Sequence, residues 1–248
     1  MSIFKKLFPS KKLATPVDLS VLHCDVHSHF VPGIDDGSKS VDNSVEMIRH
    51  FYNQGYKKII TTPHVMGDFF RNNPENILEG LEKVKHQLKV ENIPVEMAAA
   101  AEYYMDYEFE EKIGKEKLLT FGDNYILMEV SYVNEPDNLE RVLFKLQTHG
   151  YKPVLAHPER YPFWFNKIEP FENLFNKGII LQMNINSLTG YYSPETKKTA
   201  EMLIDRGFIR LLGSDCHHMG HVDLMKQVVY SPHLKKLIDS GNLMNKFL

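Results

Sequence analysis

The sequence predicts an α/β fold, a distorted (β/α)7–8 TIM-like barrel in a single domain. Three observations predict it: apolar, strand-like runs alternate with segments of helical periodicity, glycines separate the two, and the chain has 248 residues. Alternating strands and helices favour a parallel sheet. A chain of about 250 residues without a linker or low-complexity segment has the length of one such barrel.

Seven runs rich in β-branched and apolar residues are predicted to be strands. They are residues 22–29, 58–64, 95–103, 125–130, 153–157, 179–185 and 209–214. This many strands in a chain of this length favour a closed barrel over an open sheet.

Helices are predicted between the strands. Apolar residues fall on one face at helical spacing around residues 41–52 and 77–88, and further helices are expected over 139–148, 171–176, 194–206 and 224–229. Ser40 and the pair Asn73-Pro74 are signals for helix starts. Glycines that follow a helix and precede a strand are predicted to adopt the left-handed C-cap conformation; these are Gly55, Gly150, Gly178 and Gly207.

Composition excludes several classes of protein. With 43% hydrophobic and 25% charged residues the chain is neither disordered nor fibrous, and a net charge of −3 gives no basic field for nucleic acid. No run of about 18 apolar residues is present, so no transmembrane segment is expected. Two cysteines far apart in sequence favour a reducing compartment, and hence the cytoplasm. Residues 1–20 are predicted to be a flexible basic segment, with the barrel domain over 21–248.

Residues able to bind metals lie at the ends of the predicted strands. In α/β barrels the chemistry takes place at the carboxyl ends of the strands and in the loops that follow them. Residues i and i+2 of a strand point to the same side, so His27 pairs with His29, and Asp215 with His217. The full set is His27, His29, Asp36, His64, Glu102, Glu129, His157, Asp215 and His217.

Imidazole and carboxylate ligands favour Zn, Mn or Fe over Ca or Mg. One tetrahedral ion needs about four ligands, so this set predicts two or three divalent ions that share a bridging carboxylate. Taken alone, Asp35 and Asp36 would be a turn signal ahead of Gly37. The roles of His218 and His221 stay open, and no functional role is expected for the remaining histidines, His23, His50, His86, His149 and His233.

The ordered motifs resemble those of a known superfamily. The motifs are Asp25-Val26-His27-Ser28-His29, Asp35-Asp36-Gly37-Ser38-Lys39-Ser40, Thr62-Pro63-His64, Ala101-Glu102-Tyr103-Tyr104, Ala156-His157-Pro158-Glu159-Arg160 and Ser214-Asp215-Cys216-His217. This set resembles the PHP (polymerase and histidinol phosphatase) superfamily, and most closely the bacterial PHP-type protein-tyrosine phosphatases linked to capsule and exopolysaccharide synthesis. The resemblance implies a distorted barrel of the PHP type with a trinuclear metal centre.

The resemblance also implies roles for individual residues. It assigns the first ion to His27, His29, Glu102 and Asp215. Glu102 bridges to a second ion held with Glu129 and His157, and Asp36, His64 and His217 hold the third. Arg160 binds the substrate phosphate, so Arg160, Glu102 and His157 are the expected catalytic residues. Relatives can place another arginine after the segment of His217; this chain has His218-Met219-Gly220-His221 there, and only Arg71 offers a basic group in the loop after His64.

The expected activity is that of a metal-dependent protein-tyrosine phosphatase, in which a metal-activated hydroxide attacks phosphorus. The substrate implied by the resemblance is a phosphotyrosine protein, a bacterial tyrosine kinase of capsule synthesis. A cysteine mechanism is excluded, because the positions six residues after Cys24 and Cys216 hold Phe30 and Val222 rather than arginine. Aromatic residues near the predicted strand ends are candidate walls for a phosphotyrosine slot, namely Phe30, Phe69, Phe70, Tyr103, Tyr104, Tyr161, Phe163, Trp164 and Phe165.

Three alternatives remain open at this point. One is a PHP phosphatase of a small metabolite such as histidinol phosphate. The second is a nuclease, which the acidic charge balance disfavours. The third is a metal-binding protein without catalytic activity. No general acid for the leaving group is evident; a metal-bound water and His218 are candidates by position alone.

Overall fold

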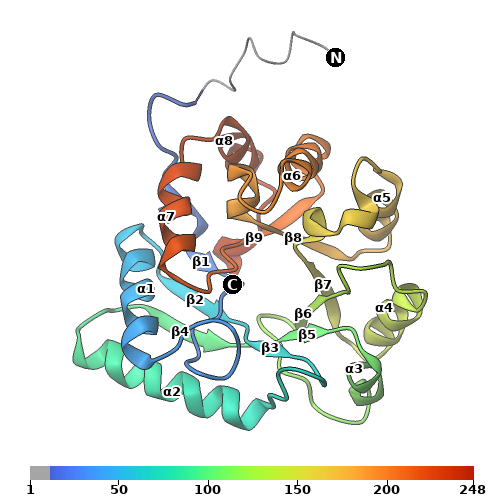
Figure 1. Ribbon diagram of the computed structural model, residues 1–248, viewed down its shortest axis with the longest axis horizontal. Coiled ribbons are helices and arrows are strands. Elements are labelled where there is room, and N and C mark those ends of the chain that lie inside the picture. The colour runs from blue at the N-terminus through green and yellow to red at the C-terminus, as the bar shows by residue number, and fades with distance from the viewer. Residues whose placement is uncertain (1–11) are drawn as a thin grey trace.

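The computed structural model describes residues 12–248 as a ring of parallel strands surrounded by helices (Figure 1). The predicted TIM-like barrel in a single domain is therefore confirmed. The strands are β1 (Cys24–Asp25), β2 (Lys58–Thr61), β3 (His64–Val65), β4 (Glu96–Ala99), β5 (Glu102–Tyr104), β6 (Tyr125–Glu129), β7 (Lys152–Ala156), β8 (Ile180–Asn184) and β9 (Ile209–Gly213).

Two of the predicted strands are each broken in the middle. The predicted strand 58–64 divides into β2 and β3, and 95–103 divides into β4 and β5. One sheet has the order β1-β2-β4, and the other runs β3-β5-β6-β7-β8-β9. Pro63 explains the first break, because it has no backbone N–H to donate to a strand ladder. Because of these two breaks, the barrel is distorted relative to a regular one.

The barrel is closed where the extension of β1 meets the extension of β9. Ser28 forms an isolated parallel bridge with Cys216, and the backbone N–H of Asp215 donates to the carbonyl of His27 at 2.8 Å. The Ser214 hydroxyl donates to the carboxylate of Asp25 at 2.8 Å, and both groups are buried. This seam holds the first and last ligand segments of the chain against each other.

The helices that surround the strands mostly match the prediction. They are α1 (Val41–Asn53), α2 (Pro74–Val90), α3 (Tyr107–Lys112), α4 (Leu139–Thr148), α5 (Glu169–Asn176), α6 (Pro194–Arg206), α7 (Met219–Val228) and α8 (Pro232–Asp239). Ser40 and Asn73 cap α1 and α2 through their side chains, and the four predicted C-cap glycines all have positive φ. The sequence prediction missed α3 and α8, and placed the start of α7 five residues too late.

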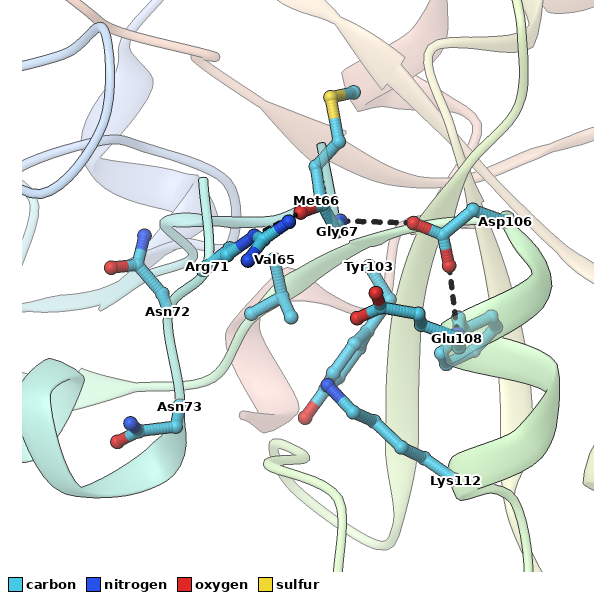
Figure 2. A pocket seen from close by; sticks show the side chains of 11 residues that line it. Val65, Met66, Gly67, Arg71, Asn72, Asn73, Tyr103, Asp106, Glu108 and Lys112 are labelled. Atoms are coloured by element: carbon cyan, nitrogen blue, oxygen red, sulfur yellow. Dashed lines mark hydrogen bonds between the residues drawn. The ribbon is translucent and has the colours of Figure 1, made fainter. Parts of the chain in front are cut away.

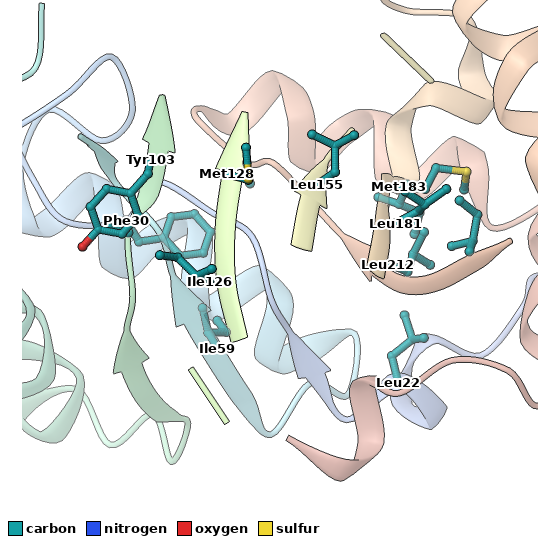
Figure 3. Close-up of a cluster of buried hydrophobic side chains, with 14 of the residues drawn as sticks. Leu22, Phe30, Ile59, Tyr103, Ile126, Met128, Leu155, Leu181, Met183 and Leu212 are labelled. Carbon is teal, nitrogen blue, oxygen red and sulfur yellow. The ribbon is translucent and has the colours of Figure 1, made fainter. Parts of the chain in front are cut away.

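Alternation along each strand divides the core into two layers. On β6, Ile126 and Met128 pack toward the helices, whereas Leu127 points into the barrel with Val154 and Leu211. Figure 3 shows part of the outer layer, where side chains of β6 to β9 meet residues of the loops and helices. Because side chains alternate, the residue two places after Leu127, which is Glu129, also faces the barrel interior.

The predicted boundary at residue 20 stays a prediction. Residues 1–11, most of the predicted basic segment, lie outside the described residues. Of the rest, the N–H groups of Leu13 and Val17 donate to the carbonyls of Tyr230 and Val229, and Leu19 is buried. Among residues 12–248, no helix has both the length and the apolar character needed to span a bilayer.

Candidate metal centre

The nine predicted ligand residues come together at the carboxyl ends of the strands. Ligand atoms from these residues fall into four overlapping groups, each lying within 4.8 Å. The register of the strands produces this meeting: His64 of β3 lies beside Glu102 of β5, and the next strand, β6, ends on Glu129. The sequence predicts that all nine side chains converge, and in the structure they do.

Four donor atoms lie close together, and three of them form a triangle. His27 Nε2, His29 Nε2 and Asp215 Oδ1 are each 3.4 Å from the other two. Glu102 Oε2 lies 3.1 Å from His27 Nε2 and 3.4 Å from His29 Nε2.

These distances match the geometry of a bound metal ion. Ligands about 2.0–2.1 Å from a tetrahedral ion are about 3.3–3.4 Å apart. All four side chains are buried. The two imidazole nitrogens of His27 and His29 and the Asp215 oxygen are spaced as one face of a tetrahedral site for a divalent transition-metal ion.

Glu102 links this set to the other ligands. Its second oxygen, Oε1, lies 3.0 Å from His157 Nε2, and its Oε2 lies 3.3 Å from His64 Nδ1. Glu129 approaches the same two imidazoles, at 3.2 Å from His64 Nδ1 and 3.8 Å from His157 Nε2. A carboxylate with one oxygen in each of two ligand groups fits a bridging position.

The remaining ligands lie at the more exposed edge of the site. Asp36 Oδ1 is 3.3 Å from His217 Nε2 and 3.6 Å from His64 Nε2. The ring of His217 stacks on that of His29 at a centroid distance of 3.9 Å. His64 therefore faces Asp36 with one ring nitrogen, and Glu102 and Glu129 with the other.

Polar side chains behind the ligands determine how the imidazoles are oriented. His27 Nδ1 donates to Gln182 Oε1 at 2.8 Å, and His29 Nδ1 donates to the carboxylate of Asp35 at 2.8 Å. A proton on Nδ1 leaves the Nε2 lone pair free for a metal ion. Asn184 Nδ2, in turn, donates to Asp215 Oδ2 at 2.6 Å.

Gln182 and Asn184 were not predicted from the sequence, and Asp35 was predicted to contribute to the turn before Gly37 but not to contact a ligand. Asp35 does accept the N–H of Gly37, as a turn residue would, but its other oxygen faces His29. A signal for the other two exists in the sequence. Polar residues alternate with apolar ones along β8, which is otherwise a buried strand, and that pattern places both amides inside the barrel.

The site favours ionised carboxylates despite its burial. Burial alone would raise the pKa of Glu102, but the imidazoles of His27 and His64 outweigh it and hold the pKa well below its ordinary value. Burial also acts to raise the pKa of Asp215, and His27 with His217 lowers it well below the usual range. Metal binding requires these anionic carboxylates but also neutral imidazoles. Burial acts to lower the pKa of His64, but Glu102 and Glu129 raise it to about 9, so an ion bound there would displace a proton.

Two of the ligand residues have an unusual backbone conformation. His157 and Asp215 both have positive φ, 34° and 50°, which is uncommon outside glycine. Such strain persists where the surroundings hold it in place, often at functional sites. Here the buried carboxylate of Glu159 secures the turn after His157, by accepting the N–H of Asn184 at 2.9 Å and the hydroxyl of Ser187 at 2.6 Å.

A cavity of about 500 Å³ opens over the ligands. Arg160 lines it, and its Nη1 donates to Asp215 Oδ2 at 2.8 Å. His218 and His221, whose roles the sequence left open, also line it.

The aromatic wall of this cavity differs from the expected one. Of the nine aromatic residues suggested by the sequence, only Phe70 lines the cavity; the others that do so are Tyr132, Tyr191 and Tyr192. Several of the suggested residues, such as Phe30 and Trp164, are buried in the core instead. Composition near a strand end cannot distinguish a ring that faces the cavity from one that packs behind it.

A second, smaller pocket of about 210 Å³ lies next to this cavity and shares Met66 with it (Figure 2). Arg71 lines this pocket and donates from Nε to the carbonyl of Gly67 at 2.7 Å. Asp106 accepts the N–H of the same glycine at 3.0 Å. Arg71, the one basic group that the sequence offered after His64, is thus not among the residues that line the cavity over the ligands.

Comparison with known proteins agrees with the geometry. The tyrosine-protein phosphatase YwqE of Bacillus subtilis is 32% identical over 196 residues, which cover 79% of this chain and 77% of that protein. The tyrosine-protein phosphatase CpsB of Streptococcus pneumoniae is 28% identical over 218 residues, covering 86% and 90%.

A solved structure shows the same fold. It is one of the crystal structures of YwqE from Bacillus subtilis and CpsB from Streptococcus pneumoniae, which are described as unique metal-dependent tyrosine phosphatases. It superposes with a TM-score of 0.77 at 29% identity, covering 87% of this chain and 91% of that one. Residues 23–236 match the family described as Capsular polysaccharide synthesis, CpsB/CapC. The ligand motifs, the barrel and these matches together show that the chain belongs to the CpsB/CapC family.

Proposed function

We propose that this chain is a metal-dependent protein-tyrosine phosphatase. The observation that carries the proposal is the convergence of nine histidine, aspartate and glutamate side chains beneath a cavity lined by one arginine. The relatives named tyrosine-protein phosphatases support the substrate class.

The ligand set holds two or three divalent ions of Mn, Fe or Zn. His27, His29, Glu102 and Asp215 would hold one, and the spacing of 3.4 Å among the donor atoms of His27, His29 and Asp215 supports this assignment. Glu102 bridges to a group with Glu129 and His157, and the last group is Asp36, His64 and His217. His64, which faces two groups, is the ligand whose assignment depends most on the number of ions bound.

The ions supply Lewis acidity and lower the pKa of a water molecule toward neutrality. The chain itself supplies the phosphate-binding cation. The Arg160 guanidinium, planar and always charged, offers parallel N–H donors that match phosphate oxygens. Among the described residues, the Arg160 guanidinium donates one side-chain hydrogen bond, to Asp215. The aromatic side chains around the cavity are suited to a tyrosine ring, whose hydroxyl has a pKa of about 10 and so leaves without full protonation.

The physiological substrate is proposed to be a phosphorylated tyrosine kinase of capsule synthesis. The names of the relatives support a phosphotyrosine protein as substrate, and the family description supports the link to capsule synthesis. Both cysteines are free and buried, which supports the cytoplasm as the compartment.

Turnover of a phosphotyrosine peptide tests the proposal, with histidinol phosphate as the competing substrate. We expect clear preference for the peptide, and loss of turnover in Glu102→Ala and His157→Ala. Preference for histidinol phosphate would assign the chain to metabolite phosphatases. Turnover that survives both substitutions would contradict the metal mechanism.

A further inference from the structure

Arg160 is held in place by contacts beyond its ion pair. Its Cζ lies 4.1 Å from the ring centroid of Tyr192 and 5.2 Å from that of Tyr132. The two rings belong to different loops, one after β8 and one after β6. Together with the hydrogen bond to Asp215, these contacts fix the guanidinium from three directions.

The fixed position matters because the cavity has no other strong cation. Among the described residues that line it, Arg160 is the only lysine or arginine. A free arginine side chain loses about 2 kcal/mol of rotamer freedom when it is immobilised. A guanidinium that the protein already holds loses less when a phosphate binds, so its affinity for the ligand is greater.

Of the two rings, that of Tyr192 has the closer contact and the simpler role. Tyr132 also approaches His157, with its hydroxyl 3.3 Å from Nδ1, so a change at Tyr132 would disturb a metal ligand as well. The hydroxyl of Tyr192 is buried and has no hydrogen-bond partner among the described residues. Its ring is the part of Tyr192 that contacts the Arg160 guanidinium.

We propose that Tyr192 is a positioning residue, whose ring holds the Arg160 guanidinium ready for the phosphate group of the substrate. This inference rests on the proposed function for the identity of the substrate, but not for the binding of phosphate itself. Tyr192 is expected to act through Arg160 and not through the metal ions.

The test measures binding of inorganic phosphate to the metal-loaded full chain by calorimetry. Cation–π contacts contribute about 0.5–2 kcal/mol, so Tyr192→Leu should weaken phosphate binding by about two- to thirtyfold. Tyr192→Phe keeps the ring and should bind within about twofold of the unchanged protein. Tyr107→Leu, at an exposed tyrosine on α3 outside the cavity, is the control for the substitution itself.

A double-mutant cycle separates positioning from a general structural effect. If Tyr192 acts through Arg160, adding Tyr192→Leu to Arg160→Ala should cause no further loss of phosphate affinity. Additive losses would overturn the proposal, and so would Tyr192→Phe binding as weakly as Tyr192→Leu, since the hydroxyl would then be the active group. Metal content should be equal in all variants; loss of metal in Tyr192→Leu would also refute the proposed role.

Failure of the proposed function can be distinguished from failure of the role proposed for Tyr192. A chain that does not hydrolyse phosphotyrosine but shows the predicted cycle for inorganic phosphate would refute the substrate and retain the role of Tyr192. A chain that hydrolyses phosphotyrosine with kcat and KM unchanged in Tyr192→Leu would retain the proposed function and refute the role of Tyr192.

Discussion

Replacing Gln182 by leucine tests whether the residues behind the ligands tune the metal centre. Gln182 is fully buried, accepts from His27 Nδ1 at 2.8 Å and donates to the carbonyl of Met183 at 2.8 Å and to Asn184 Oδ1 at 3.1 Å. Leucine has a similar volume but no polar atoms. The substitution therefore removes the group that keeps the proton of His27 on Nδ1.

Two effects of different size are expected. A buried donor left without its acceptor costs about 1–3 kcal/mol, so the free energy of unfolding without metal should fall by about 2 kcal/mol. For a chain of this size that lowers Tm by roughly 4–8 °C. Loss of a hydrogen-bond partner behind a ligand typically weakens metal binding about 10- to 100-fold, and that larger effect should appear in metal affinity.

The assay is competition with a chelator of known affinity, combined with thermal unfolding of the metal-free protein. Asn245→Leu is the matched control, because Asn245 is a buried amide that bonds only to the backbone of Cys24 and Leu212. The control should lose stability and keep the metal affinity of the unchanged chain. Wild-type metal affinity in Gln182→Leu would refute the reasoning.

Three further results are expected. Gly213→Ala should lower the free energy of unfolding by about 1–3 kcal/mol, because a Cβ there would lie 2.6 Å from Cβ of His27 and 2.7 Å from Nε2 of Gln182; an unchanged Tm would contradict this overpacking. Asp35→Asn should weaken metal binding about tenfold by removing the carboxylate that faces His29 Nδ1, and equal affinity in the chelator competition would assign Asp35 to the turn alone. Removal of metal should lower Tm and abolish turnover, and added Mn or Zn should restore both, whereas a Tm indifferent to chelator would contradict binding at the buried set.

The sequence was sufficient to predict which nine side chains meet, because strand position and side-chain type both indicate them. His27 and His29 share one side of a strand by simple alternation, and the barrel brings distant strand ends such as those at Glu102 and Asp215 to one rim. A closed barrel of parallel strands could be predicted without knowing how the side chains pack. The same rules predicted the positive φ of Gly55 and the cap at Ser40.

Features that depend on tertiary packing were less accessible. The break at Pro63 was readable from its missing N–H, but the matching break at Ala100 follows only from the pairing of β4 and β5 with their neighbours. Tyr132 and Tyr192 lie in loops, where no periodicity indicates which side chains turn toward the cavity. Short helices such as α3 have too few turns to show a pattern.

Titration of the metal-free chain with divalent ions, while hydrolysis of a phosphotyrosine peptide is followed, tests the central claim most directly. No turnover is expected without metal, and activity should rise until two or three ions are bound per chain. Hydrolysis by the metal-free protein, or full occupancy of the ligand set without any hydrolysis of phosphotyrosine, would contradict it.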